Sequence, residues 1–217
     1  MSLFRKNTDE GVKVISPTNL GLLEKKLSDK EMNYLWRCID NSEKSFKKRL
    51  AGQIHESKSL NDKSDWFFNN TLTKMCRLYG EEFGNLGKNI PTNQNHPYYM
   101  NSWWVNYQKQ NEFNPLHDHG GVYSFIVWMK IPTNHDEQNR NPLASRSNIE
   151  KISVVDFLYS NILGQPQVLE YRMNPDMEGT MLFFPALLRH QVYPFYNCDE
   201  DRISISGNIM LNTAKTL

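Results

Sequence analysis

The hydrophobic positions of the chain follow one spacing in its first half and another in its second. Between residues 19 and 50, apolar residues recur mostly at helical spacings with charges between them. The pattern breaks at Ser28 and Asp29, either of which could cap a second helix. A further amphipathic stretch runs from about Ser64 to Gly80. We therefore expect helices in the first part of the chain, with their apolar sides packed against the rest of the protein.

Beyond a stretch rich in Gly, Asn and Pro at residues 85–97, the pattern is typical of β-strands. Short apolar or alternating runs are separated by turn residues, and no helical pattern lies between them. Strands are predicted at residues 102–108, 122–131, 152–158, 167–171, 180–184, 191–193 and 202–209. This series predicts an all-β sandwich or jelly roll.

Two polar stretches are expected to play no part in the chemistry. Residues 133–148 are irregular and long for a structureless connection, so we expect a mobile flap or a partly disordered loop. His135 lies in this loop, which is a poor place to fix a metal ligand. Lys47-Lys48-Arg49, in the helical part, is expected to be a solvated helix face.

The length of the chain, 217 residues, fits a single domain with one buried core. We expect a mainly β protein with N-terminal helices, of the α+β class. Residues 1–97 would form a helical part that packs on the sheet, and residues 98–217 would form the β core of the same domain.

The charges of the chain nearly balance. Its 25 Lys and Arg against 24 Asp and Glu leave a net charge of +1, so no strong field points to nucleic acid or to an anionic membrane. Three cysteines without a CxxC pair argue against a disulfide framework. No apolar run reaches the roughly 20 residues of a membrane span. We expect a cytoplasmic protein that acts on a small molecule or a peptide, with neither nucleic acid nor a membrane as partner.

The candidate chemistry lies in residues 114–121, Asn-Pro-Leu-His-Asp-His-Gly-Gly. His117 and His119 stand at positions i and i+2, so in an extended segment both side chains project to the same side. His190 follows the predicted strand 180–184 closely, and the end of a strand can present a ligand at the rim of a sheet. Together these three histidines predict a metal site with open coordination positions.

The ligand set leaves alternatives open. Many iron sites use two histidines and a carboxylate, usually placed two residues after the first histidine, and here that position holds His119. Either His117, His119 and His190 bind the metal, or a kink near residues 120–121 lets Asp118 turn inward. A third alternative leaves His119 outside the ligand shell. We prefer the three-histidine set, because neutral imidazole is a good ligand for iron, copper and zinc.

Arg202 and Ser204 share one face of the last predicted strand. A guanidinium fork with a hydroxyl beside it suits a carboxylate. The alternative is that Arg202 pairs with Asp199 or Glu200, or lies exposed at the start of the strand.

Four aromatic residues on the predicted strands could line an apolar pocket, but we expect them in the core. They are Trp103, Trp104, Tyr123 and Trp128.

The order of these elements resembles the iron(II)- and 2-oxoglutarate-dependent oxygenases. Residues 114–119 followed by Ser124-Phe125 look like a less characterised branch whose motif is HxH rather than HxD, and the resemblance covers about residues 100–212. It implies a double-stranded β-helix, which is a distorted jelly roll. It also implies that His117 and His190 bind iron, with His119 in the place of the usual carboxylate.

The same resemblance implies the cofactors Fe(II) and 2-oxoglutarate. Arg202, assisted by Ser204, would bind the distal carboxylate of 2-oxoglutarate, and Tyr107 resembles a tyrosine that often hydrogen-bonds this co-substrate. The implied activity is hydroxylation of an unknown substrate, coupled to decarboxylation of 2-oxoglutarate to succinate. Two other functions fit the residues: a cupin-like three-histidine dioxygenase that needs no 2-oxoglutarate, and a jelly-roll binding module without catalysis.

Overall fold

The computed structural model describes residues 4–7, 13–15, 19–42, 44–92 and 94–216. Its helices are α1 (Asp29–Asp40), α2 (Thr73–Phe83), α3 (His135–Asn139) and α4 (Pro142–Ser145), and a π-helical turn at Phe68–Leu72 leads into α2. Its strands are β1 (Phe4–Asn7), β2 (Lys13–Ile15), β3 (Leu23–Lys26), β4 (Glu56–Ser59), β5 (Tyr98–Gln108), β6 (Asn114–His117), β7 (Tyr123–Lys130), β8 (Val154–Ser160), β9 (Pro166–Arg172), β10 (Thr180–Pro185), β11 (Arg189–Val192) and β12 (Arg202–Leu211).

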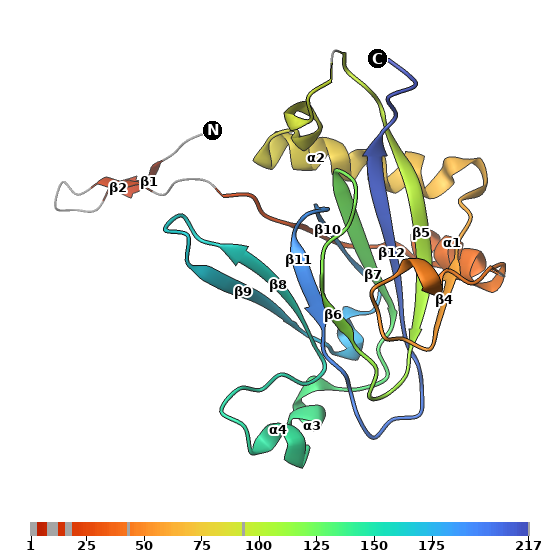
Figure 1. The fold of residues 1–217 in the computed structure, drawn as a ribbon, viewed down its shortest axis with the longest axis vertical. Helices are drawn as coiled ribbons and strands as arrows, with labels where there is room; N and C mark the ends of the chain where they lie inside the picture. Colours follow the sequence, from red (N-terminus) through yellow and green to blue (C-terminus); the bar gives the residue numbers. More distant parts are fainter. Residues whose placement is uncertain (1–3, 8–12, 16–18, 43, 93, 217) are drawn as a thin grey trace.

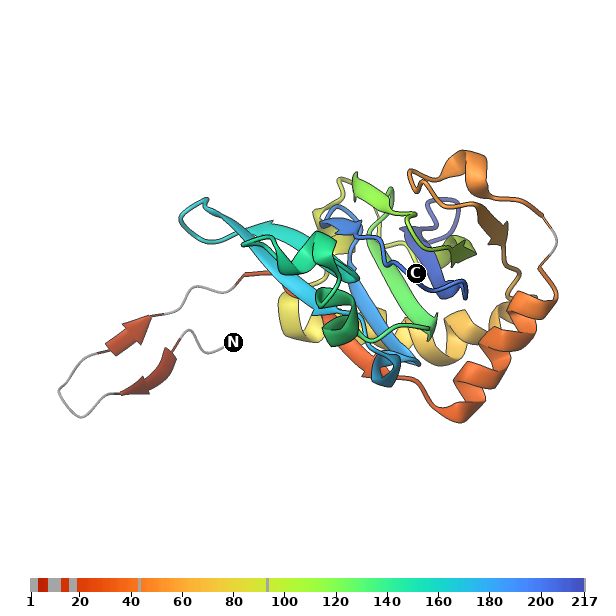
Figure 2. The ribbon, with the colours of Figure 1, turned by 90° about the horizontal axis from the view of Figure 1, so that it is seen from below.

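Two antiparallel sheets face each other, and α1 and α2 cover the outer side of the larger one (Figures 1 and 2). The larger sheet has the strand order β3-β10-β7-β12-β5-β4, and the smaller has the order β6-β11-β8-β9. The hairpin of β1 and β2 forms a separate pair. The main architecture is therefore the mainly β sandwich with N-terminal helices that the sequence predicts.

Strand β7 separates two hydrophobic cores. Side chains alternate across a strand, so Phe125 and Val127 pack toward the helices. Ile126 and Trp128 pack toward the smaller sheet. Because β7 is buried on both faces, its sequence is a continuous apolar run and not an alternating one.

The helical predictions are partly confirmed. Ser28 is the N-cap of α1, and α2 continues three residues past Gly80 to Phe83, where Gly84 follows with φ 91°. The prediction of helix directly before Ser28 is wrong, because residues 23–26 form β3 and pair with β10. Its alternating half-buried and exposed side chains show that strand pairing overrides the local helical spacing.

Both edge strands of the larger sheet, β3 and β4, come from the first 97 residues. The sheet thus draws strands from both sides of the boundary predicted at residue 97.

No helix among the described residues has the length and apolar character needed to span a membrane.

The flap prediction for residues 133–148 is wrong. This segment forms α3 and α4, and its asparagines cap these helices: Asn134 accepts a hydrogen bond from the Asp136 amide, and Asn141 accepts one from the Leu143 amide. Gln138 fixes α3 through two 2.8 Å hydrogen bonds with the backbone of Tyr196. Asparagine therefore signals helix starts here, and not an unstructured loop.

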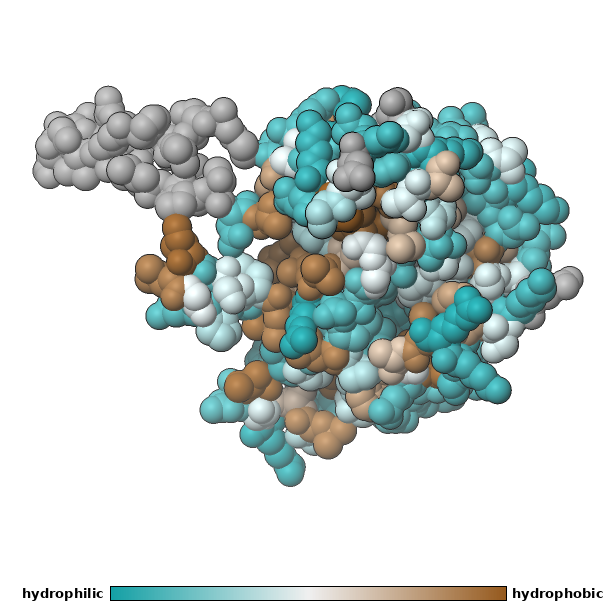
Figure 3. All heavy atoms as spheres, turned by 45° about the horizontal axis from the view of Figure 1, so that its top comes forward, coloured by the Kyte–Doolittle hydropathy of each residue, from teal (hydrophilic) through white to brown (hydrophobic). Residues whose placement is uncertain are grey.

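Exposed apolar side chains gather around the hairpin of β8 and β9. Figure 3 shows hydrophobic surface concentrated on one side of the visible face, while the rest is mainly hydrophilic. The exposed apolar residues of this hairpin are Tyr159, Ile162, Leu163, Val168 and Leu169.

Glu31 joins the N-terminal elements, and its charge should stabilise the fold. Its carboxylate accepts hydrogen bonds from Lys25 Nζ at 2.8 Å, from the Ser28 amide at 2.8 Å and from Thr71 Oγ1 at 2.7 Å. Burial alone would raise the pKa of Glu31, but these donors outweigh it and lower the pKa from 4.5 to about 2. The carboxylate therefore contributes stability above pH 4.5 that is lost as the pH falls toward 2.

We expect Glu31→Gln to lower the free energy of unfolding at pH 7 by about 1–2 kcal/mol, because charge-assisted hydrogen bonds are replaced by neutral ones. Urea denaturation measured from pH 7 to pH 2 should show the difference between the variant and the wild type shrinking below pH 4.5. A difference that stays constant over this range would contradict the role of the charge.

Candidate metal and co-substrate site

The fold brings His117, His119 and His190 together. His117 ends β6 and lies opposite His190 of β11 in the register of the smaller sheet. His119 lies two residues past β6, and its amide donates a 2.9 Å hydrogen bond to the Ala186 carbonyl oxygen. One possible ligand atom from each histidine lies within 4.8 Å of the other two. The i, i+2 spacing thus places His119 correctly, but a backbone hydrogen bond holds it rather than strand pairing.

The hydrogen bonds of the three rings fix which nitrogen can bind a metal. Each Nδ1 faces an oxygen that only accepts: Pro115 O at 2.7 Å from His117, Asn208 Oδ1 at 2.9 Å from His119, and Leu188 O at 3.0 Å from His190. Each Nδ1 must therefore carry the hydrogen, which leaves the lone pair on Nε2.

Two of these lone pairs converge. The Nε2 atoms of His119 and His190 are 3.2 Å apart. With both rings neutral and protonated at Nδ1, no hydrogen lies between the two atoms, so a cation is the partner that this geometry suits. The donor set therefore fits a metal ion held by imidazole nitrogens.

Burial keeps the three histidines neutral at pH 7. Desolvation and, to a lesser extent, the neighbouring His117 lower the pKa of His119 to about 4 and that of His190 to about 3. Desolvation also lowers the pKa of His117, against the opposing effect of the Pro115 carbonyl. Neutral rings are the form that binds metals.

Asp118 points away from the three histidines. Its side chain is 44% exposed, and Oδ2 lies 3.6 Å from Nε of Arg189. Of the three alternatives that the sequence leaves open, the grouping of side chains in the structure fits the one with three histidines. His135 is buried on α3, outside this group.

Arg202 is buried and cationic without a carboxylate partner among the described residues. It donates four hydrogen bonds to neutral groups: two to Gln108 Oε1, one to the Tyr193 carbonyl oxygen and a 3.5 Å one to Ser153 Oγ. Burial lowers the pKa of Arg202 to about 9, so it stays charged at neutral pH. Asp199 and Glu200 interact elsewhere, with Gln110 and Lys130. A guanidinium has five donors, so one remains for a ligand.

The histidines and Arg202 line one cavity of about 470 Å³ between the two sheets. Its polar wall comes from alternate residues of β12 and β5, and its apolar wall includes Ile126, Trp128 and Val155. The inward residues of β12 are Arg202, Ser204, Ser206 and Asn208. Sequence reasoning found Arg202 and Ser204 and missed Asn208, although the same alternation continues to it. Gln108 and Ser153 carried no comparable signal.

Tyr107 does not reach this cavity. It is paired with Ile203 in the sheet, whereas Gln108 is paired with Arg202, so the two neighbours face opposite sides of β5. Tyr107 packs against the core beneath the helices, with Lys58 Nζ 5.4 Å from its ring centroid. The predicted contact with a co-substrate is therefore wrong, because alternation turns this side chain outward.

The four aromatic residues that could line a pocket divide between the cavity and the core. Trp104 and Trp128 line the cavity, although both are almost fully buried. Trp103 and Tyr123 belong to the core beneath the helices.

Residues 102–208 match a protein-family model described as "Putative 2OG-Fe(II) oxygenase". The matched region runs from β5 to β12 and contains the three histidines and Arg202. This part of the chain is therefore similar to the 2OG-Fe(II) oxygenase family. Comparison with curated proteins finds no match to the chain.

Solved structures have a fold similar to that of this chain. A prolyl-4-hydroxylase from Pseudomonas putida has a TM-score of 0.51 at 11% identity, covering 88% of this chain and 92% of that one. A 2OG-Fe(II) oxygenase family oxidoreductase from Burkholderia pseudomallei has a TM-score of 0.50 at 12% identity, covering 88% and 84%. The carbocyclase SnoK from nogalamycin biosynthesis has a TM-score of 0.51 at 8% identity, covering 88% and 79%. This likeness confirms the predicted double-stranded β-helix.

The depressed pKa values of the histidines predict a pH dependence for the metal-free protein. As the pH falls below 6.5, these histidines become protonated in the unfolded chain. In the folded protein, buried His119 and His190 stay neutral until about pH 4 and pH 3, respectively. The free energy of unfolding should therefore fall over this range. Urea denaturation in the presence of a chelator measures it.

The double variant His119→Gln, His190→Gln provides the comparison. We expect its free energy of unfolding to fall less steeply between pH 6.5 and 4 than that of the wild type. Equal slopes would mean that the two rings do not resist protonation in the folded protein.

Proposed function

We propose that the protein is a 2-oxoglutarate-dependent oxygenase in which His117, His119 and His190 hold Fe(II) and Arg202 binds 2-oxoglutarate. One observation carries this proposal: a buried cation without a carboxylate partner among the described residues lies in the same cavity as three neutral imidazoles. Burying a charge is costly unless a counter-charge is bound nearby. The terminal carboxylate of 2-oxoglutarate is such a counter-charge, and the remaining N–H of the guanidinium can donate a charge-assisted hydrogen bond to it.

The neutral ligand set strengthens the preference for an anion. Three imidazoles leave both positive charges of a bound divalent ion uncompensated, whereas a carboxylate ligand would cancel one. Arg202 adds a third positive charge in the same cavity. The site therefore suits a dianionic co-substrate, with Ser204 as a neighbouring donor on β12.

The residues of the chain have distinct tasks. Fe(II) and 2-oxoglutarate, when bound, supply oxidation of a substrate C–H bond coupled to decarboxylation. Asn208 orients His119 by accepting its Nδ1 hydrogen, and Ser124 Oγ holds Asn208 at 2.9 Å. Gln108 orients the Arg202 guanidinium through two hydrogen bonds. The apolar wall around Trp128 limits the access of water to the cavity.

The substrate that we propose is a small molecule or a peptide that undergoes hydroxylation. This agrees with a cavity of about 470 Å³ and with the near-neutral net charge of the chain. The absence of a nucleic-acid partner and the cytoplasmic location stay predictions from composition.

Metal binding should depend on the histidines and on the residue that orients one of them. We expect His117→Ala and His190→Ala to abolish stoichiometric binding of Fe(II), measured by metal analysis after anaerobic loading. Asn208→Ala should weaken binding about 10- to 100-fold, because the orienting partner of His119 is lost. His96→Ala is the control, since its ring contacts the Lys215 carbonyl oxygen and not the cavity. Unchanged metal content in the first two variants would refute the site.

Co-substrate binding should depend on Arg202. We expect Arg202→Gln to weaken 2-oxoglutarate binding by about 2–5 kcal/mol, or more than 30-fold, because a buried ion pair loses one partner. Anaerobic titration of the Fe(II)-loaded protein measures this through the metal-to-ligand absorption band. Exposure to oxygen should then yield succinate.

Two outcomes of this titration favour the other functions. Oxygen consumption that needs Fe(II) but not 2-oxoglutarate would identify a cupin-like three-histidine dioxygenase. Neither a band nor succinate, in protein that retains its metal, would leave a binding module.

A further inference from the structure

Residues 46–55 close the open side of the sandwich, and we call them the edge-bridging segment. At its beginning, the Phe46 amide donates a 2.8 Å hydrogen bond to the Ser57 carbonyl oxygen of β4, an edge of the larger sheet. Near its end, Gln53 pairs with Phe113, directly before β6, an edge of the smaller sheet. In Figure 1 this orange segment runs between β4 and β6. Phe46, Arg49, Leu50, Ala51, Gly52 and Ile54 all line the cavity.

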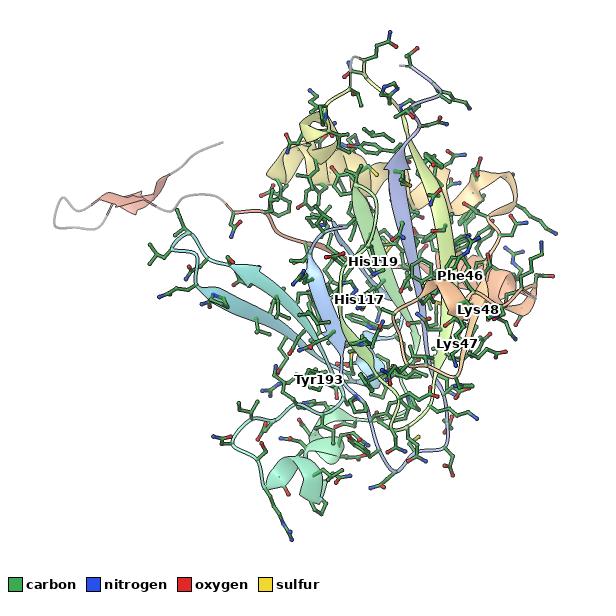
Figure 4. The ribbon with its side chains drawn as sticks, in the orientation of Figure 1. Phe46, Lys47, Lys48, His117, His119 and Tyr193 are labelled. Atoms are coloured by element: carbon green, nitrogen blue, oxygen red, sulfur yellow. The ribbon has the colours of Figure 1, made fainter. Side chains whose placement is uncertain are left out.

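A stack of planar groups leads from this segment to the histidines. The Arg49 guanidinium lies 5.6 Å from the centroid of the Phe46 ring. Phe46 stacks on Trp104 with centroids 5.3 Å apart, and Trp104 stacks on His119 at 5.8 Å. Figure 4 labels Phe46, Lys47 and Lys48 on the β4–β5 side of His117 and His119. Arg49 is exposed and lines the cavity, so it lies at its mouth.

The start of the edge-bridging segment is strongly basic. Lys47, Lys48 and Arg49 directly follow Phe46, and Lys44 lies two residues before the segment. No carboxylate of the described part of the chain pairs with any of the four. Among the described residues that line the cavity, the charged groups are Arg49, Arg202 and Asp118, and Asp118 faces Arg189. If 2-oxoglutarate occupies Arg202, the positive charge of Arg49 remains for another ligand.

We infer that the substrate carries a negatively charged group, a carboxylate or a phosphate, that Arg49 binds at the mouth of the cavity. The inference rests on the proposed function and names the substrate class for the same site. The stack on Phe46 holds the guanidinium in place, which lowers the entropy cost of binding an anion. The uncharged part of the substrate then lies along Phe46 and Trp104 toward the three histidines. Lys47 and Lys48, both exposed, attract the anion from solution.

This inference gives Arg49 a different role from its neighbours in the sequence. The solvated face expected for Lys47-Lys48-Arg49 holds for the two lysines, which are exposed and do not line the cavity. The short helical turn at Lys47–Arg49 turns the third side chain of the run toward the cavity.

The test is a binding experiment with three probes of similar shape: phenyl phosphate, benzoate and benzyl alcohol. The full chain is loaded with Zn(II) and saturated with 2-oxoglutarate, and dissociation constants are measured by calorimetry. We expect at least one anion to bind about tenfold or more tightly than the alcohol, as a charge-assisted hydrogen bond provides. The tighter of the two anions identifies the group that the site prefers.

Variants assign the preference to Arg49. Arg49→Gln should bring the anions within about twofold of the alcohol, and Arg49→Lys should restore part of the difference. Arg77→Gln is the matched control: Arg77 pairs with Glu81 on α2 and lies outside the cavity, so the preference should persist. Equal binding of the three probes to the wild type would overturn the inference. So would an anion preference that survives in Arg49→Gln, since the anion would then bind at the metal.

The readout is binding to a redox-inert metal form, so it is independent of turnover. A protein that forms no succinate with Fe(II) contradicts the proposed function, whatever the probes show. A protein that forms succinate but binds the three probes equally contradicts only the role of Arg49.

Discussion

A row of polar side chains inside a β-sandwich is the constraint on which the site depends. Four alternate residues of β12 face the space between the two sheets: Arg202, Ser204, Ser206 and Asn208. Polar groups away from water need partners, and the ends of this row have them. Arg202 donates to Gln108, and Asn208 accepts from His119. Because β12 is paired with both β5 and β7, its register fixes the histidine end and the Arg202 end of the cavity together.

The sequence predicts the fold well where a segment is long enough to show its period. Runs such as those of β7 and β10 contain enough apolar or alternating positions to exclude a helix, and each predicted strand of the second half is present. Over the four residues of β3, helical and strand spacing cannot be told apart, and pairing with β10 decides. No element was predicted over the four residues of β4. Both strands lie at edges of the larger sheet, and the identity of each depends on a partner far away in the sequence.

The site was predictable to the extent that it obeys strand alternation. That rule connects Arg202 with Ser204, and applied further along β12 it finds Asn208. Applied to β5, it shows that Tyr107 and Gln108 cannot both face the cavity once the register with Arg202 is known. The edge-bridging segment was beyond such reasoning, because Gln53 and Phe113 meet through tertiary packing. Its contribution to the cavity is a property of the closed fold and not of any local pattern.

The central position of β12 also determines when the site can exist during synthesis. β5 and β7 are made earlier, but each is paired with β12 and not with the other, so the middle of the larger sheet stays open until residues 202–211 emerge. Until then Arg202 and Asn208 are missing, and His119 has no partner for its Nδ1. A nascent chain that already carries all three histidines therefore lacks an ordered metal site. The order of the strands therefore delays assembly of the proposed metal site until β12 has been made.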